Sequence, residues 1–329
     1  MRICVAGPGA VGGHLAARLA HGGVSVSVLA RGENLAAIRA NGLRLFAEEQ
    51  TIETRVACSD DPAALGPQDC VIVTVKAHAL PALVPQLLPL LGAETPVVFA
   101  VNGIPWWYHL ELARHGHGGR ANLDTQGALR EKIGIARSIG CTIYSSNEVV
   151  SPGVIRHHGG NRWVLGEPDG RASPRIQALS AAMIAAGMEA PVTAAIRTEV
   201  WVKLLMNMSV AGLCCITGST MADIAASEEM RSLCLAILAE GRSIASAHGA
   251  VIETKPEQML PRQMPAHKPS LLQDLERGRP MEIDAIFVAA TDFARAAGVA
   301  TPVFDTLVAL LRQRAATARP GAFQARHER

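Results

Sequence analysis

The chain has 329 residues, of which 49% are hydrophobic, 18% charged and 4% aromatic, and its formal net charge is +2. The length suggests about two domains, the composition excludes a natively disordered chain, and no run approaches the ~20 apolar residues of a transmembrane helix. Residues 312–329 hold five Arg and one Glu. Because the remainder is slightly acidic, we expect neither a nucleic-acid surface nor a membrane surface on the fold.

The cysteines and the first residues indicate a reducing compartment. Seven Cys lie mostly in apolar runs, without the spacing of a zinc site or a disulfide framework. The chain opens with an apolar strand-like run and shows no signal peptide. We therefore predict a cytoplasmic protein with reduced thiols.

The first half alternates strand and helix patterns. A strand is expected at 2–6 and a helix from Val11, because Val11, Leu15 and Leu19 repeat at four-residue spacing. Alternating valines predict a strand from Val24 to Val28. Further runs predict strands at 70–75, 96–101 and 140–144 and a helix at 80–91. This order is typical of an α/β domain with a parallel sheet.

Less regular segments follow. Residues 105–132 are interpreted as an excursion over the edge of the sheet, in which Trp106-Trp107-Tyr108 either wall a ligand pocket or anchor the segment to the sheet. Residues 148–167 predict short antiparallel strands with turns at 151–153 and 158–161.

The second half lacks strand patterns. Helices are expected at 195–213, 221–248, 270–277, 283–297 and 303–314. The predicted organisation is a Rossmann-like doubly wound α/β domain (1–190), an all-α domain (191–318) and a basic tail (319–329). Apolar helix surface also suggests a homodimer.

A glycine motif joins the first strand to the first helix. Its residues are Gly7, Pro8, Gly9, Ala10, Val11 and Gly12. In this context the glycines permit a tight turn, a close approach of the backbone to a diphosphate, and close helix–sheet packing. The N-terminus of the helix favours the anion. We predict a dinucleotide-binding site here.

The end of the second strand selects the dinucleotide. An NAD site usually has an acidic residue there, whereas this chain has Leu29-Ala30-Arg31-Gly32. A guanidinium pairs with a 2′-phosphate. Arg31 therefore favours NADP(H).

Polar residues also follow two central strands. Lys76 directly follows the run 70–75, and Asn102-Gly103 directly follow the run 96–101. The carboxyl ends of parallel strands line the ligand crevice of such sheets. We therefore include Lys76 and Asn102 among the candidate binding residues.

The helical half holds the candidates for proton chemistry. Lys203 and Asn207 are four residues apart and share a face of an apolar helix. A lysine so placed is suited to protonate a developing alkoxide. Ser270 begins a helix, and Glu282, expected in the first turn of the next, is suited to orient the lysine or bind a substrate hydroxyl.

Four histidines are candidate metal ligands. His115, His117, His157 and His158 have no Cys or acidic partner at ligand spacing. We expect no metal site.

Together these motifs resemble the ketopantoate reductase (2-dehydropantoate 2-reductase) family over about residues 1–315. The motifs that carry the resemblance are GPGAVG at 7–12, ARG at 30–32, VTVKAHAL at 73–80, VNG at 101–103, WVKLLMN at 201–207 and SLLQDLERGRPMEID at 270–284.

The resemblance implies NADPH-dependent reduction of a 2-keto acid to a 2-hydroxy acid, with ketopantoate as the substrate. It implies that Lys203 is the general acid and that Glu282 binds substrate and supports the lysine. It further implies that Asn102, Asn207 and Ser270 position substrate and nicotinamide, and that Arg31 and Lys76 serve the adenosine-phosphate side of the cofactor.

Two departures fall on the substrate side. Ala211 and Gly212 stand where the family commonly has Asn and Pro, and His267-Lys268-Pro269 replace frequent Asn or Ser residues. Loss of one polar group in a buried site changes substrate preference strongly. The alternatives are a reductase of another 2-keto acid and a non-catalytic NADP(H)-sensing protein.

Overall fold

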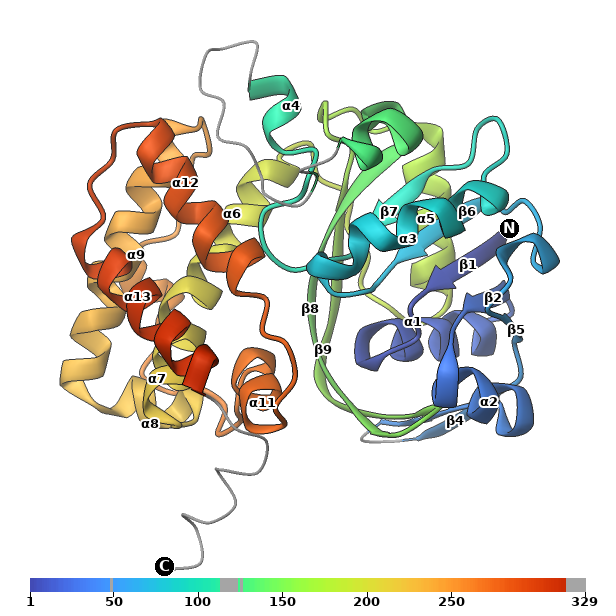
Figure 1. Ribbon diagram of the computed structural model, residues 1–329, viewed down its shortest axis with the longest axis horizontal. Coiled ribbons are helices and arrows are strands. Elements are labelled where there is room, and N and C mark those ends of the chain that lie inside the picture. Colours follow the sequence, from blue (N-terminus) through green and yellow to red (C-terminus); the bar gives the residue numbers. More distant parts are fainter. Residues whose placement is uncertain (48–49, 113–123, 125–126, 318–329) are drawn as a thin grey trace, which may run out of the picture. The chain divides into compact units, whose positions relative to one another are not determined.

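The computed structural model describes residues 1–47, 50–112, 124 and 127–317, which form two compact units (Figure 1). The described residues of the first unit are 1–47, 50–101, 124 and 127–196. Those of the second unit are 102–112 and 197–317. The chain thus passes into the second unit directly after Val101, and residues 191–196 lie with the first unit. Residues 319–329, the basic tail, lie outside the described residues.

The first unit is built on a sheet with the strand order β4-β3-β9-β8-β7-β6-β1-β2-β5. The strands β5, β2, β1, β6, β7 and β8 are mutually parallel, which confirms the predicted Rossmann-like sheet. Beyond β8 the sheet is mixed, because β9 is antiparallel to β8, β3 is parallel to β9, and β4 is antiparallel to β3. The bounds are β1 Arg2–Ala6, β2 Ser25–Leu29, β3 Leu43–Phe46, β4 Thr51–Thr54, β5 Ala57–Ser59, β6 Cys70–Val73, β7 Val97–Phe99, β8 Ser138–Ser151 and β9 Val154–Gly166.

Helices connect these strands and cover the apolar sheet. Every residue of β6 and β7 is buried, as expected for central strands covered on both faces. The helix bounds are α1 Ala10–His21, α2 Gly32–Asn41, α3 Leu80–Leu87 and α5 Pro174–Ala185. Short 3₁₀ helices lie at Pro62–Ala64, Ala77–Ala79, Leu88–Leu90 and Ile135–Arg137, and a π-helical segment lies at Leu129–Ile133. The core joins Val5, Leu15, Ile72 and Val98.

The antiparallel region differs from the prediction. Instead of several short strands, β8 and β9 form one long hairpin with a turn at 152–153 (Figure 1). The turn predicted at 158–161 is wrong. Gly159 and Gly160 have positive φ values (145° and 69°), and the pairing register shifts beside them. These glycines therefore form a β-bulge inside a continuous strand.

The second unit is helical. Its elements are α4 His109–Leu112, α6 Ile196–Met206, α7 Gly212–Thr217, α8 Met221–Ala226, α9 Glu228–Ala247, α10 Pro256–Met259, α11 Ser270–Glu276, α12 Ala289–Ala296 and α13 Pro302–Thr317. Two π-helical segments, η8 (Asn207–Ala211) and η9 (Asp284–Val288), continue into α7 and α12. The predicted single helix at 221–248 is two helices, because the Ser227 side chain caps the second by accepting a hydrogen bond from Met230 N–H (3.3 Å).

The aromatic triplet belongs to the helical unit, so the alternative in which it anchors the segment to the sheet is wrong. Tyr108 is fully buried, and its hydroxyl accepts a hydrogen bond from Trp201 Nε1 at 2.6 Å. Its ring packs edge-on against Trp201 and Phe293. Of the predicted excursion 105–132, residues 113–123 and 125–126 lie outside the described residues.

One stretch, Ile196–Thr217, has the length and hydropathy of a membrane-crossing helix. However, 67% of its most apolar window is buried within the protein. Core helices share these properties, and Trp201, Leu204, Leu205 and Met208 belong to the core of the second unit.

Candidate active-site residues in the two units

The glycine loop fits an anionic cofactor. Gly7 has φ +93°, and a Cβ there would lie 2.5 Å from Val75 Cγ1. A Cβ on Gly12 would overlap Thr74 Oγ1 and the Gly7 carbonyl oxygen. In contrast, nothing lies within 4 Å of the position of a Cβ on Gly9. Gly7 and Gly12 therefore serve internal packing, and Gly9 leaves open space beside the loop.

The helix that follows has the electrostatics of an anion site. Gly9 is the N-cap of α1, with no capping side chain and no acidic residue in the first turn. The N–H groups of a first turn lack intrahelical partners, and the helix dipole makes this end positive. Pro8, Ala10 and Val11 complete the loop. A diphosphate fits these residues.

The ends of the neighbouring strands adjoin this loop. Gly7 N–H donates a hydrogen bond to Leu29 O at the end of β2 (3.1 Å), and Thr74 N–H donates to Ala6 O (3.0 Å). Arg31 follows β2 as the exposed N-cap of α2. Lys76 follows β6 and is half-buried, one residue after the Val75 side chain that faces Gly7. The first unit thus carries the loop, Arg31 and Lys76.

Sequence reasoning missed two side chains that hold this loop. The Thr74 hydroxyl donates to Gly7 O at 2.8 Å. Asn34 Nδ2 donates to Pro8 O at 2.7 Å, and Asn34 Oδ1 accepts from Gly153 N–H at 2.9 Å. Thr74 carried a weak signal, because it lies near the end of the predicted strand 70–75 and two residues before Lys76. Asn34 carried none, since its partners are 26 and 119 residues away.

The second unit brings two predicted residues into direct contact. Asn102 Nδ2 donates to Glu282 Oε2 at 3.2 Å across 180 residues of sequence. Glu282 is buried, with 9% of its surface exposed. It directly precedes the helix that contains η9, and its carbonyl oxygen accepts from Ile286 N–H, so it lies at the N-cap rather than in the first turn.

A glycine permits this contact. Gly103 has φ +89°, and a Cβ there would overlap the carbonyl of Ala285. Ile104 N–H donates to the same carbonyl at 3.1 Å. Residues 102–104 therefore lie directly against η9, which fixes Asn102 beside Glu282.

Lys203 and Asn207 lie on one continuous helix, which changes from α to π geometry at Asn207 and back to α geometry at Gly212. Lys203 is in the last turn of α6, and Asn207 begins the π-helical segment η8. Both side chains are half-buried. The segments η8 and η9 pack against each other. A Cβ on Gly212 would lie 3.2 Å from Phe287 of η9. π-Helical segments within α-helices occur frequently at functional sites.

Ser270 lies on another element of the second unit. It is exposed at the first residue of α11. Nearby, Lys268 pairs with Glu276 (2.6 Å), and Arg279 pairs with buried Asp274 (3.0 Å) just before Glu282. None of the described contacts joins Ser270 to Asn102 or Glu282.

Of the four candidate histidines, the two that the structure describes have other partners. His157 Nδ1 lies 2.9 Å from Asn147 Oδ1, and His158 Nε2 lies 3.2 Å from Glu148 Oε2. His115 and His117 lie outside the described residues. Among the residues that the structure describes, no three His, Cys, Asp or Glu form a metal-binding group. The seven cysteines are free thiols, and burial raises the pKa of Cys4 to about 11.

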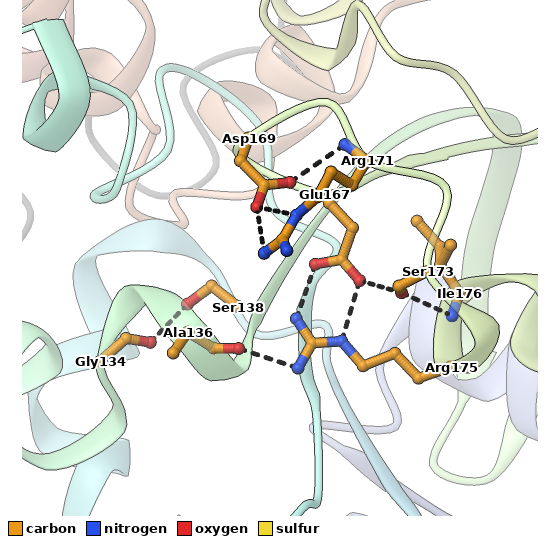
Figure 2. A network of polar contacts seen from close by, with 9 residues as sticks. All are labelled: Gly134, Ala136, Ser138, Glu167, Asp169, Arg171, Ser173, Arg175 and Ile176. Atoms are coloured by element: carbon orange, nitrogen blue, oxygen red, sulfur yellow. Dashed lines mark hydrogen bonds and ion pairs between the residues drawn. The ribbon is translucent and has the colours of Figure 1, made fainter.

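A polar network stabilises the connection after β9 (Figure 2). Glu167 is buried and accepts two hydrogen bonds from Arg175, at 2.8 and 2.6 Å. Arg175 also donates to Ala136 O (2.8 Å), and Ser173 donates to Glu167 (2.5 Å) while capping α5. This network joins the start of α5 to the segment before β8.

The parallel sheet, its glycine loop and the helical unit define a dinucleotide-binding oxidoreductase. Comparisons assign the family. The model for "Ketopantoate reductase PanE/ApbA" matches residues 3–170, and the model for its C-terminal domain matches residues 195–315. The chain belongs to the ketopantoate reductase family, whose members are oxidoreductases that use a nicotinamide cofactor.

Individual relatives match this chain along nearly their whole length. A 2-dehydropantoate 2-reductase from Mesorhizobium japonicum is 42% identical over 317 residues, which cover 95% of this chain and 97% of the relative. The crystal structure of a putative ketopantoate reductase from Ralstonia solanacearum is 40% identical with a TM-score of 0.89, covering 96% of this chain and 98% of that one. A D-mandelate dehydrogenase solved with NADH shares the fold at 20% identity, with a TM-score of 0.82 and coverage of 97% of this chain and 99% of that one.

Proposed function

We propose that this protein reduces 2-dehydropantoate (ketopantoate) to pantoate with NADPH, as a step of pantothenate biosynthesis in the cytoplasm. The observation that carries the proposal is the contact between Asn102 and Glu282, in the unit where Lys203 of α6 and Asn207 of η8 lie four residues apart. These four residues supply the proton donor, the carboxylate and the amides that reduction of a 2-keto acid requires.

The residues of the first unit serve the cofactor in this proposal. The N–H groups at the start of α1 bind the diphosphate, with Gly9 allowing its close approach. The Arg31 guanidinium pairs with the 2′-phosphate, which gives NADPH its advantage over NADH. Lys76 adds positive charge on the adenosine-phosphate side. The reduced nicotinamide, when bound, supplies the hydride.

The residues of the second unit serve the substrate. Lys203 donates a proton from Nζ to the C2 oxygen, so that the carbonyl carbon gains a hydride and its oxygen gains a proton. Glu282 accepts a hydrogen bond from a substrate hydroxyl and orients Lys203. Asn102 holds the Glu282 carboxylate, and Asn207 and Ser270 bind substrate oxygens. Preorganised charge of this kind stabilises the developing alkoxide.

The test is NADPH oxidation by the purified protein with ketopantoate, with pyruvate and 2-ketoisovalerate as competing substrates and NADH as the alternative cofactor. Fast turnover with ketopantoate and NADPH supports the proposal. Tight NADPH binding without turnover of ketopantoate refutes the assignment of ketopantoate as substrate and supports the assignment of NADPH as cofactor.

A second candidate substrate class is favoured by Ala211. This residue is buried in η8, where its methyl group offers no hydrogen bond to a substrate hydroxyl. A 2-keto acid without the terminal hydroxyl suits such a position. Faster turnover of 2-ketoisovalerate than of ketopantoate in the same assay identifies this class.

One variant distinguishes an enzyme from a non-catalytic NADP(H) sensor. Lys203→Ala abolishes turnover but retains the NADPH dissociation constant if the protein is an enzyme. The absence of turnover with every 2-keto acid in the wild type favours the sensor. Light scattering of the same sample tests the proposed homodimer.

A further inference from the structure

We propose that Asn34 is a positioning residue for the cofactor diphosphate, because it fixes the Pro8–Gly9 peptide plane. This inference rests on the proposed dinucleotide binding and extends it to a residue outside the glycine motif. Asn34 lies in the first turn of α2, is half-buried, and contacts the loop from the α2 side.

Both polar groups of the Pro8–Gly9 peptide are held. Its carbonyl accepts from Asn34 Nδ2 at 2.7 Å, and its N–H donates to Gly7 O at 2.7 Å. Because a peptide unit is planar, two bonds at opposite ends fix its orientation. Gly9 is the N-cap of α1, so this orientation determines how the first N–H groups of the helix are presented.

The other end of the Asn34 amide is also anchored. Its Oδ1 accepts from Gly153 N–H at 2.9 Å, in the turn between β8 and β9. Gly153 has φ +76°, and a Cβ there would lie 3.5 Å from Ile38 of α2. The hairpin turn thus packs along α2 and holds the amide in place. Pro8 O can only accept and Gly153 N–H can only donate, so an amide satisfies both where a carboxylate cannot.

This residue matters for the glycine loop in particular. Glycine has more accessible backbone conformations than other residues, so a glycine loop needs contacts from outside to hold one conformation. Packing does not restrain Gly9, because nothing lies within 4 Å of the position of a Cβ there. Without the Asn34 bond, the Pro8 carbonyl is free to rotate toward the position of the diphosphate. An anion would then meet a carbonyl oxygen instead of N–H groups alone.

The test compares dissociation constants measured by nicotinamide fluorescence and by NMR titration. The variant is Asn34→Ala, and the matched control is Asn41→Ala, because Asn41 is exposed at the end of the same helix. The ligands are NADPH, NADH and adenosine 2′-monophosphate, which carries the 2′-phosphate but no diphosphate. Arg31→Ala is measured in parallel.

We expect Asn34→Ala to weaken NADPH and NADH by the same factor, about tenfold, as for loss of one or two hydrogen bonds. Binding of adenosine 2′-monophosphate stays unchanged in Asn34→Ala, and Asn41→Ala behaves as the wild type. Unchanged dinucleotide affinity overturns the inference. Parallel weakening of adenosine 2′-monophosphate also overturns it, because α2 as a whole has then moved.

The Arg31→Ala arm separates the two proposals. It weakens NADPH and adenosine 2′-monophosphate but not NADH if Arg31 binds the 2′-phosphate. If Asn34→Ala weakens dinucleotide binding but Arg31→Ala does not, the proposed preference for NADPH through Arg31 is wrong and the role of Asn34 is supported. If the wild type binds neither dinucleotide, both fail.

Discussion

Glu282 accepts a hydrogen bond from Asn102, and this contact joins the segment after β7 to the start of η9. Glu282 has 9% of its surface exposed, and buried polar groups require hydrogen-bond partners. Asn102 supplies one of them from a position fixed by the approach of Gly103 to Ala285. The geometry therefore holds the Glu282 side chain in one orientation.

Removing that charge is expected to reduce turnover. Glu282→Gln keeps the shape and the ability to accept from Asn102 but loses the charge, and we expect kcat to fall about 10²–10³-fold. Asn102→Ala, which leaves the carboxylate in place, should lower kcat/KM about tenfold or more. The matched control is Asp284→Asn, which removes a carboxylate charge at an exposed position two residues away. Wild-type kcat in Glu282→Gln would contradict its proposed role.

A carboxylate on α9 caps the last described helix. Glu240 accepts hydrogen bonds from Val303 N–H (3.0 Å) and Phe304 N–H (2.8 Å) at the start of α13. We expect Glu240→Ala to lower the free energy of unfolding by about 1–2 kcal/mol, because two first-turn donors lose their partner. Urea denaturation measures this. Glu253→Ala, at an exposed loop position, should change it by less than about 0.5 kcal/mol. Equal effects of the two substitutions would rule out the cap.

His14 makes stability depend on pH. Its ring is fully buried on α1, stacks on His157 and Trp163, and accepts from Arg18 Nε at 3.1 Å. Burial, then the charges of His157 and Arg18, lower its pKa from 6.5 to about 3. The unfolded chain therefore binds one more proton between about pH 3 and 6.5, so the free energy of unfolding rises with pH across this window and falls on acidification.

The measurement is the slope of the unfolding free energy between pH 4 and 6. His14→Gln should reduce this slope by about 1 kcal/mol per pH unit, because glutamine does not titrate. His21→Gln, at the exposed end of the same helix, should leave it unchanged. An unchanged slope in His14→Gln would mean that His14 is not neutral in the folded state.

The Glu167–Arg175 pair depends on the shape of the guanidinium. Arg175 makes two hydrogen bonds to Glu167 and a third to Ala136 O, and a lysine cannot reproduce this geometry. With Arg175 about one-third exposed, we expect Arg175→Lys to cost about 1–2 kcal/mol of stability. Arg171→Lys, 83% exposed, is the matched control. Thermal unfolding that shifts equally in both would argue against the network.

The parts of the molecule that sequence predicts best are those set by local patterns. The parallel strands follow from apolar runs that are buried on both faces, such as Cys70–Val73, and the loop from three glycines between a strand and a helix. Helices at 270–276 and 302–317 follow from 3.6-residue periodicity.

The remaining features depend on contacts that are distant in sequence. The role of Asn34 requires the partner Gly153, and the place of Tyr108 requires Trp201 and Phe293. The π-helical segments η8 and η9 have ordinary helical sequences, and their geometry is seen only where they pack together. Gly159 and Gly160 match a turn and form a bulge instead, because pairing with β8 continues on both sides.

The chain contributes residues 102–112 to the helical unit before it completes the sheet. Ile104 and Tyr108 are buried in the core of that unit, although more than 90 residues separate them from Trp201. A single cut near residue 196 therefore does not divide the polypeptide into two independent halves. The fragment after the cut would lack two core side chains, and the fragment before it would carry them without a hydrophobic environment.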